Sequence, residues 1–82
     1  MSDPAARVVL IGRPQCHLCD DARSVVSSVC DPLGVVWVER SILDDPALYD
    51  EYEERIPVLL VDGGFVGQWL LDADDLRARL SD

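Results

Sequence analysis

The stretch RVVLIGRPQCHLC, residues 7–19, contains a strand-like run followed by the beginning of a helix. The run over residues 7–11 is rich in β-branched side chains and too short for a helix, so it predicts a strand buried on both faces. Gly12 and Pro14 break that run. A helix is then predicted from about Cys16 to Val29, because apolar residues recur there at helical spacing and form one stripe: Leu18, Ala22, Val25, Val26 and Val29.

The rest of the chain predicts three more strands and two more helices. The segment Asp31–Gly34 ends the first helix, and Asp62-Gly63-Gly64 has the chemistry of a hairpin turn. The remaining strands are expected at residues 35–40, 58–61 and 65–67, and the remaining helices at residues 46–54 and after Asp72. A helical crossover makes the first two strands parallel, and the hairpin makes the last two antiparallel. We therefore predict an α/β protein of order β-α-β-α-β-β-α, with helices flanking a four-stranded mixed sheet.

Length and charge limit what the chain can be. Its 82 residues predict a single domain, with residues 1–6 as a frayed leader. The net charge of −9 argues against nucleic acid and anionic membrane surfaces as partners. No apolar run approaches the roughly 20 residues of a membrane span, and the first residues lack the pattern of a signal peptide. We therefore expect a cytoplasmic protein, and three cysteines are no disulfide framework of a secreted one.

The spacing Cys16-His17-Leu18-Cys19 is the feature that predicts chemistry. Residues three apart on a helix have Cβ atoms roughly 5–6 Å apart, and a disulfide needs Cα atoms about 4.4–6.8 Å apart, so the two thiols can close a bond without moving the backbone. Cys16 lies at the helix start, where unpaired N–H groups and the helix dipole stabilise a thiolate. Cys16 should be the exposed nucleophile, and Cys19 the buried thiol that resolves a mixed disulfide.

Neighbouring charges act on Cys16 in both directions. Asp20 and Asp21 favour the protonated thiol and Arg13 favours the thiolate, and we expect Arg13 and the helix start to prevail. His17 has two interpretations. Its protonated imidazole would stabilise the thiolate, or it is simply a solvent-exposed residue of the first helical turn.

Four features over about residues 7–80 resemble glutaredoxin-like members of the thioredoxin-fold family. They are the Val/Ile-rich first strand, the Cys-x-x-Cys pair at the helix start, Ile56-Pro57 before the third strand, and the Gly-rich hairpin before the last helix. The run Arg55–Leu59, together with Trp69, is similar to a small glutaredoxin-like bacterial family. The resemblance implies a thioredoxin-like fold in which Pro57 is a cis-proline that faces the cysteine pair and leaves the Ile56 backbone free to bind a substrate chain.

The chain departs from that family where glutathione binds. His17-Leu18 replaces the usual Pro-Tyr between the cysteines, and Arg55 stands where Thr is usual. The segment Val66–Leu70 lacks the second Gly and the Asp that hold the γ-glutamyl end of glutathione, whereas Arg13 matches a basic position that meets a glutathione carboxylate. Glutathione or another low-molecular-weight thiol is therefore a candidate co-substrate. Trp69 either covers the active site, contacts a partner or packs at the sheet edge.

The predicted function is that of a small thiol–disulfide oxidoreductase, a monomer without a bound cofactor that acts on disulfides of proteins or small molecules. No metal site is predicted, because structural zinc needs four ligands and Cys30 lies too far along the same helix. Two other classes stay open. One is a dimer that shares an iron–sulfur cluster through one Cys per subunit, with glutathione completing the ligands. The other is a redox-inert adaptor that kept the fold.

Overall fold

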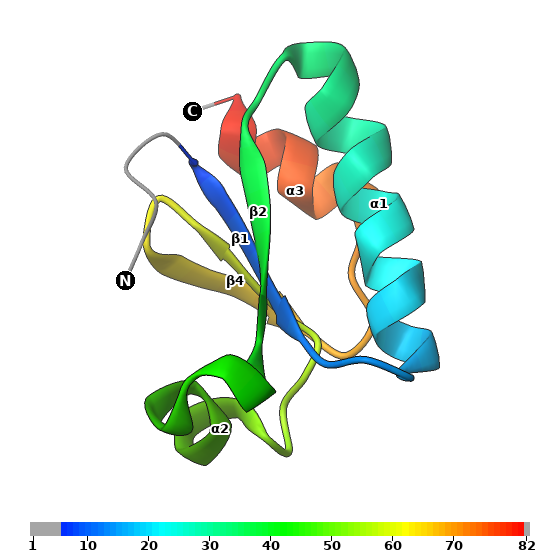
Figure 1. Cartoon of the computed structure of the whole chain (residues 1–82). Coiled ribbons are helices and arrows are strands. Elements are labelled where there is room, and N and C mark those ends of the chain that lie inside the picture. Colours follow the sequence, from blue (N-terminus) through cyan, green and yellow to red (C-terminus); the bar gives the residue numbers. More distant parts are fainter. Residues whose placement is uncertain (1–5, 82) are drawn as a thin grey trace.

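The computed structural model describes residues 6–81 and contains one mixed sheet flanked by helices (Figure 1). The strands are β1 (Val8–Gly12), β2 (Trp37–Ser41), β3 (Val58–Val61) and β4 (Gly64–Gln68). The helices are α1 (His17–Leu33), α2 (Pro46–Tyr52) and α3 (Ala73–Leu80), with a short 3₁₀ helix, η1 (Ile42–Asp44), between β2 and α2. This order confirms the predicted β-α-β-α-β-β-α arrangement.

β1 lies in the middle of the sheet, whose strand order is β2-β1-β3-β4. It pairs in parallel with β2 and antiparallel with β3, and β3 and β4 form the predicted antiparallel hairpin. Asp62 and Gly63 both have positive φ angles (51° and 83°), as a type I′ hairpin turn requires. Because β1 and β2 are parallel, their carboxyl ends lie at the same edge of the sheet, and from this edge the chain enters α1.

The sheet separates two apolar cores. On one face, α1 and α3 pack against the sheet, and Leu10 of β1 is fully buried in that core (Figure 1). On the other face, Ile11 of β1 packs with residues of η1 and α2, including Leu48 and Tyr52. Neighbouring residues of a strand point to opposite faces, so the two cores confirm that β1 is covered on both sides.

α1 is longer than predicted, and β2 is correspondingly shorter. α1 continues through Pro32 and ends at Gly34, which takes the left-handed conformation with a φ of +67°. The Val35 N–H donates to the Cys30 carbonyl at 3.0 Å and completes this helix end. Val35 is thereby held at the helix end, and β2 begins only at Trp37.

Two further predictions about the helices need correction. The predicted inward position of Leu18 is wrong: Leu18 is 39% exposed, because α1 turns Cys19 rather than Leu18 toward the end of β1. α2 ends at Tyr52, earlier than predicted, and the Arg55 N–H then donates to the Tyr52 carbonyl, three residues back, at 2.8 Å in a tighter turn ahead of Pro57. The ring of Pro57 disfavours the helical conformation at the preceding residue, Ile56, so the helix cannot continue there.

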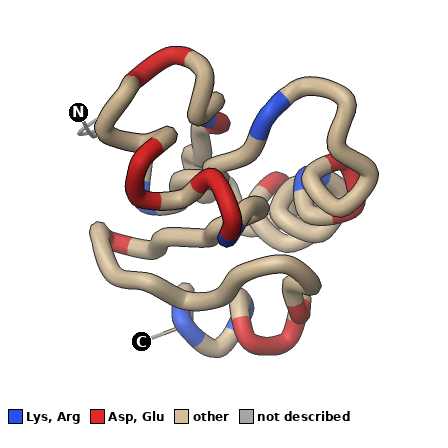
Figure 2. Tube along the Cα trace, turned by 90° about the horizontal axis from the view of Figure 1, so that it is seen from below, with Lys and Arg blue, Asp and Glu red and all other residues tan. Residues whose placement is uncertain are grey.

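The surface charge follows the sequence. Acidic residues are distributed over the helices and several connecting loops (Figure 2), so the net charge of −9 is not concentrated in one segment. The predicted frayed leader, residues 1–6, lies outside the described residues except for Ala6. Between residues 6 and 81, no helix is both long enough and apolar enough to cross a membrane.

Candidate active site

Cys16 is the N-cap residue of α1. Its backbone is extended (φ −126°, ψ 113°), and its Sγ accepts a hydrogen bond from the Cys19 N–H at 3.2 Å. An N-cap side chain satisfies one of the free N–H groups at a helix start, and here a sulfur takes the place that an oxygen usually occupies. Gln15, with a φ of +58°, turns the chain into the helix. The Cys16 sulfur thus lies where an N–H group and the helix dipole stabilise negative charge.

Cys19 lies in the first turn of α1 and is completely buried. Its sulfur packs against Gly12 of β1, since a Cβ atom on Gly12 would come within 2.9 Å of the Cys19 Sγ. Burial, and then the hydrogen bond with Cys16, raises the pKa of the Cys19 thiol to about 11. The charge of Glu39 adds to this rise, while a backbone hydrogen bond with Arg13 opposes it. Cys19 is therefore protonated at neutral pH.

The third cysteine does not belong to this pair. Cys30 is buried in the main core near the other end of α1, and burial, followed by the charge of Asp31, raises its pKa. At 1.5 Å per residue, Cys30 lies about 21 Å along the helix from Cys16. Within the described part of the chain, no three His, Cys, Asp or Glu side chains gather at a position suited to a metal ion.

Pro57 ends the segment that connects α2 to β3. The Ile56–Pro57 peptide bond is cis, and Pro57 is fully buried. The Ile56 N–H donates to the Tyr52 carbonyl at 3.2 Å. This bond corrects the expectation that the whole Ile56 backbone is free, because only its carbonyl lacks an internal partner among residues 6–81.

Trp69 follows β4 and returns to this same segment. Its backbone N–H donates to the Pro57 carbonyl at 2.9 Å, and its indole Nε1–H donates to the Glu54 carbonyl at 3.3 Å. Its φ is +66°, a value rare for a bulky residue. Trp69 is also 52% exposed, so one part of the residue is bonded to the segment and another faces solvent.

Arg55 ties the segment to β4 in a way that the sequence did not indicate. Its Nε donates to the Gln68 Oε1 at 3.0 Å. Its guanidinium lies over the rings of Phe65 and Tyr52, at 5.2 and 5.5 Å from their centroids. Arg55 also pairs with Glu51, one helical turn earlier, at 3.6 Å. Arg55, in the place where Thr is usual, therefore holds the end of α2 and the end of β4 together.

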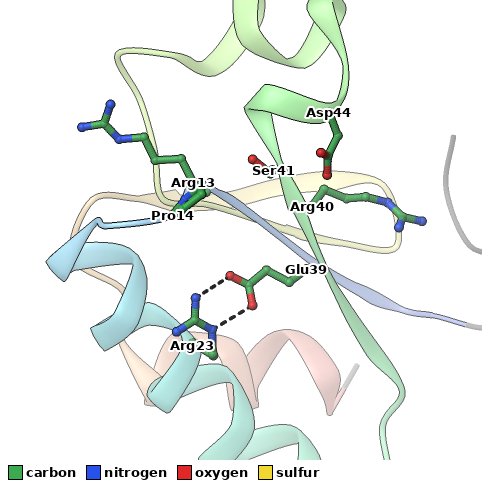
Figure 3. Close-up of a pocket in the computed structure, with 8 residues that line it drawn as sticks. Arg13, Pro14, Arg23, Glu39, Arg40, Ser41 and Asp44 are labelled. Carbon is green, nitrogen blue, oxygen red and sulfur yellow. Dashed lines mark hydrogen bonds and ion pairs between the residues drawn. The ribbon is translucent and has the colours of Figure 1, made fainter.

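A surface pocket of about 370 Å³ lies between the β1–α1 loop, α1, the end of β2 and η1 (Figure 3). Arg23 of α1 forms a bidentate pair with Glu39 of β2, at 2.8 and 2.7 Å, along one side of the pocket. Arg13 and Arg40 also line it, but their guanidinium groups point away from each other. Sequence reasoning did not find this pocket, because the parallel crossover assembles it from residues far apart in the chain.

Arg13 and His17, the other predicted site residues, flank Cys16 in the sequence and are solvent-exposed. In the described part of the chain, neither side chain forms a hydrogen bond or an ion pair with Cys16. The charge of Arg13 instead acts on the hydroxyl of Tyr49 in α2. The pKa of Tyr49 is raised, chiefly by its hydrogen bond with Glu53, and the charge of Arg13 partly opposes this rise. The structure thus brings Cys16 and Cys19 into contact with each other, and it also brings Trp69 into contact with Pro57.

Known proteins share the sequence pattern and the fold of this chain. Residues 7–81 match the model of a family described as Glutaredoxin-like domain (DUF836). The X-ray structure of the structural-genomics target protein XcR50 from X. campestris is 35% identical, with a TM-score of 0.73 over 90% of this chain and 95% of that one. Thioredoxin 1 from Thermosipho africanus is 7% identical, with a TM-score of 0.62 over 90% of this chain and 93% of that one. The holo form of glutaredoxin C1 from populus tremula x tremuloides is 13% identical, with a TM-score of 0.55 over 93% and 75%. No curated protein sequence matches the chain.

Proposed function

The chain belongs to the glutaredoxin-like domain family and has a thioredoxin-like fold, and from this premise we propose that it is a thiol–disulfide oxidoreductase. The redox pair is Cys16 and Cys19. The observation that carries the proposal is the inequality of the two sulfurs: Cys16 is partly exposed and accepts a backbone N–H, whereas Cys19, one turn later, is buried with a raised pKa. A dithiol that reduces disulfides needs this division between an attacking and a resolving thiol.

Cys16 is the nucleophile of the proposed reaction. Its thiolate attacks one sulfur of a substrate disulfide and forms a mixed disulfide with that half of the substrate. The other half leaves as a thiolate and takes a proton from solvent. Before the attack, the Cys19 N–H and the start of α1 stabilise the Cys16 thiolate.

Cys19 completes the reaction. It loses its proton to solvent and attacks the Cys16 Sγ, which releases the second half of the substrate as a thiol and leaves a Cys16–Cys19 disulfide. Two electrons have then passed from the dithiol to the substrate. Negative charge on Cys16 is one cause of the high pKa of Cys19. Because the mixed disulfide removes that charge, the first step makes the second easier.

The remaining parts of the proposal concern partners. The substrate is a protein or small-molecule disulfide that binds beside Pro57 and Ile56, and His17 and Trp69 lie among the residues it contacts. Glutathione or another low-molecular-weight thiol returns the pair to the dithiol, with Arg13 as the cation for its carboxylate. We propose a cytoplasmic monomer with no resident cofactor.

Equilibration with defined ratios of thiol to disulfide, followed by alkylation and mass spectrometry, tests the proposal. We expect a reversible two-electron step at roughly −200 to −270 mV, the range from glutaredoxins to thioredoxin. Cys16→Ser and Cys19→Ser should abolish the step, and Cys30→Ala, the matched control, should leave it in place. A Cys16→Ser variant with full disulfide-reducing activity would refute the assignment.

The alternative is a non-catalytic module that binds an iron–sulfur cluster or a protein partner, and no feature of the described residues favours it. A cluster needs about four thiolate ligands, of which each chain of a dimer that shares the cluster would supply one, so glutathione would have to provide the rest. Visible absorbance of anaerobically purified protein separates the two functions, since only a cluster absorbs there. A cysteine pair that never closes in the titration would point to the partner-binding module.

A further inference from the structure

Trp69 restrains the segment before β3 from both ends. Its backbone N–H bonds to the Pro57 carbonyl, and its indole N–H bonds to the Glu54 carbonyl. These two carbonyls flank the two residues between them, so one side chain and one peptide group hold the whole segment. The preceding residue, Gln68, adds a third contact, because its Oε1 accepts a hydrogen bond from Arg55 Nε.

The backbone of Trp69 is held in a conformation that a bulky residue rarely adopts. A φ of +66° is accessible to glycine without strain, whereas a side chain makes it costly. Such a conformation persists only where the surroundings over-determine it. Here the Pro57 and Glu54 carbonyls hold Trp69 in this conformation. The indole N–H donates to the Glu54 carbonyl, a hydrogen bond that a glycine could not form because it has no side chain.

The restrained segment presents two backbone carbonyls that accept no internal hydrogen bond. The Ile56 N–H is already bonded to the Tyr52 carbonyl, Pro57 has no N–H, and the Pro57 carbonyl is bonded to Trp69. The Arg55 and Ile56 carbonyls are left without an internal hydrogen-bond partner in the described residues. Of the two, the Ile56 carbonyl is nearer to β3, whose Val58 pairs with Ile11 at the end of β1, just ahead of the loop that leads to Cys16. A carbonyl of this kind accepts a hydrogen bond from an N–H, which a polypeptide backbone presents at a fixed position along its chain, whereas hydroxyethyl disulfide has no N–H and only hydroxyl groups on flexible ends.

We infer that Trp69 is a positioning residue that holds the Ile56 carbonyl in place to accept an N–H from the chain of a polypeptide disulfide. The exposed part of the indole contacts the side chains of that chain. This inference rests on the proposed function and narrows its substrate to polypeptide disulfides. Trp69 takes no part in the sulfur chemistry, so its loss weakens the binding of a peptide more than it slows the attack on a small disulfide.

Trp69→Phe tests the inference, with Trp37→Phe as the matched control. The Trp37 indole N–H donates to the Asp31 Oδ1 at 3.2 Å, so each variant loses one indole hydrogen bond, but only Trp69→Phe loses one at the Pro57 segment. For a short disulfide-linked peptide, we expect Trp69→Phe to lower kcat/KM about fivefold, as for one lost hydrogen bond, and mainly through KM. Reduction of hydroxyethyl disulfide should fall by a clearly smaller factor, because this disulfide has no backbone N–H for the Ile56 carbonyl, and Trp37→Phe should alter neither rate.

Hydrogen exchange gives a second measurement that does not need activity. The amides of Arg55 and Ile56, which both donate to the Tyr52 carbonyl, should exchange faster in Trp69→Phe and as in the wild type in Trp37→Phe. Equal losses on both substrates, or an unchanged rate with the peptide, would overturn the positioning role. If the wild-type protein reduces neither substrate, the proposed function fails. The hydrogen-exchange comparison then still tests whether Trp69 restrains the segment. Exchange of the Arg55 and Ile56 amides at the wild-type rate in Trp69→Phe would overturn that restraint.

Discussion

The Cys16 sulfur accepts an N–H at the solvent boundary, whereas the Cys19 sulfur is buried against Gly12. With its pKa of about 11, only about one Cys19 in a thousand is a thiolate at pH 8. We therefore expect iodoacetamide to modify Cys16 first in the reduced folded protein and to spare Cys19 and Cys30, as peptide mapping by mass spectrometry will show. In concentrated urea, all three should react at similar rates. Equal modification of Cys16 and Cys19 in the folded protein would contradict the assignment of the nucleophile.

Gly12 is the residue that gives the Cys19 sulfur its place. In Gly12→Ala, the added methyl group would lie 2.9 Å from the Cys19 Sγ, and neighbouring atoms would have to move. Overpacking of this kind costs about 1–3 kcal/mol, which urea unfolding will measure. The same substitution should cost less in a Cys19→Ala background, because the sulfur is gone. If Gly12→Ala lowered the free energy of unfolding equally in the wild type and in Cys19→Ala, the contact with the Cys19 sulfur would not be the cause of the loss.

Ionisation of Cys19 links stability to pH. Its pKa is raised from an ordinary value of 9.0 to about 11, so the folded protein holds the proton more tightly than the unfolded chain does. The associated stability is complete below pH 9 and is lost as the pH rises to 11, by roughly 2 kcal/mol. Burial raises the pKa of Cys30 as well, so Cys30 acts in the same direction.

Urea unfolding between pH 8 and 11 measures this loss of stability. We expect Cys19→Ala to flatten the alkaline decline, and to do so more than Cys30→Ala. An undiminished decline in Cys19→Ala would mean that other groups govern alkaline unfolding.

At the scale of elements, the end of α1 depends on one backbone conformation. Gly34 has a φ of +67°, and a Cβ atom there would meet nothing within 4 Å, so alanine would be strained without a clash. Gly34→Ala should lower the free energy of unfolding by about 1 kcal/mol. Gly64→Ala is the matched control, because Gly64 has no positive φ and its Cβ would make an ordinary 3.5 Å contact with the Val61 carbonyl oxygen. Equal losses in the two variants would exclude the conformation of Gly34 as the cause.

The start of α1 could be predicted from the sequence, but its end could not. The position of Cys16 and the burial of Cys19 follow from a spacing of three residues within one helical turn. At the other end, Asp31-Pro32 indicates a break, yet the helix includes Pro32. A proline in the last turn removes only one N–H donor, which the packing of a long apolar face outweighs, and the left-handed Gly34 then ends the helix.

The Pro57 segment shows why the rest of the site could not be predicted. Pro57 and Trp69 can each be identified from the sequence as candidate site residues. The bond between Trp69 and Glu54 joins residues 15 positions apart and depends on how β4 pairs with β3, where the register shifts between Leu59 and Leu60. Register is a property of the assembled sheet, and a slip of one residue would move Trp69 to the opposite face.

The negative charge belongs to the molecule as a whole. Acidic residues occur on the helices and in connecting loops (Figure 2), and the net charge is −9. Several arginines are engaged in ion pairs: Arg7–Asp62, Arg23–Glu39 and Arg77–Asp74. Each pair removes as much negative as positive charge locally, so the net charge of −9 comes from acidic residues outside these pairs. The field of these residues extends about 8 Å at physiological ionic strength.

This field should select substrates by charge. At low ionic strength, we expect reduction of the dication cystamine to exceed reduction of the dianion dithiodiglycolate several-fold, each relative to its reaction with dithiothreitol. The ratio should approach one in 1 M NaCl, with uncharged hydroxyethyl disulfide as the control for general effects of salt. Arg13, an exposed cation three residues before Cys16 in the β1–α1 loop, acts against the field, so Arg13→Gln should widen the ratio. If the wild-type protein prefers the dianion and Arg13→Gln abolishes that preference, then Arg13, rather than the field of the whole molecule, selects the substrate.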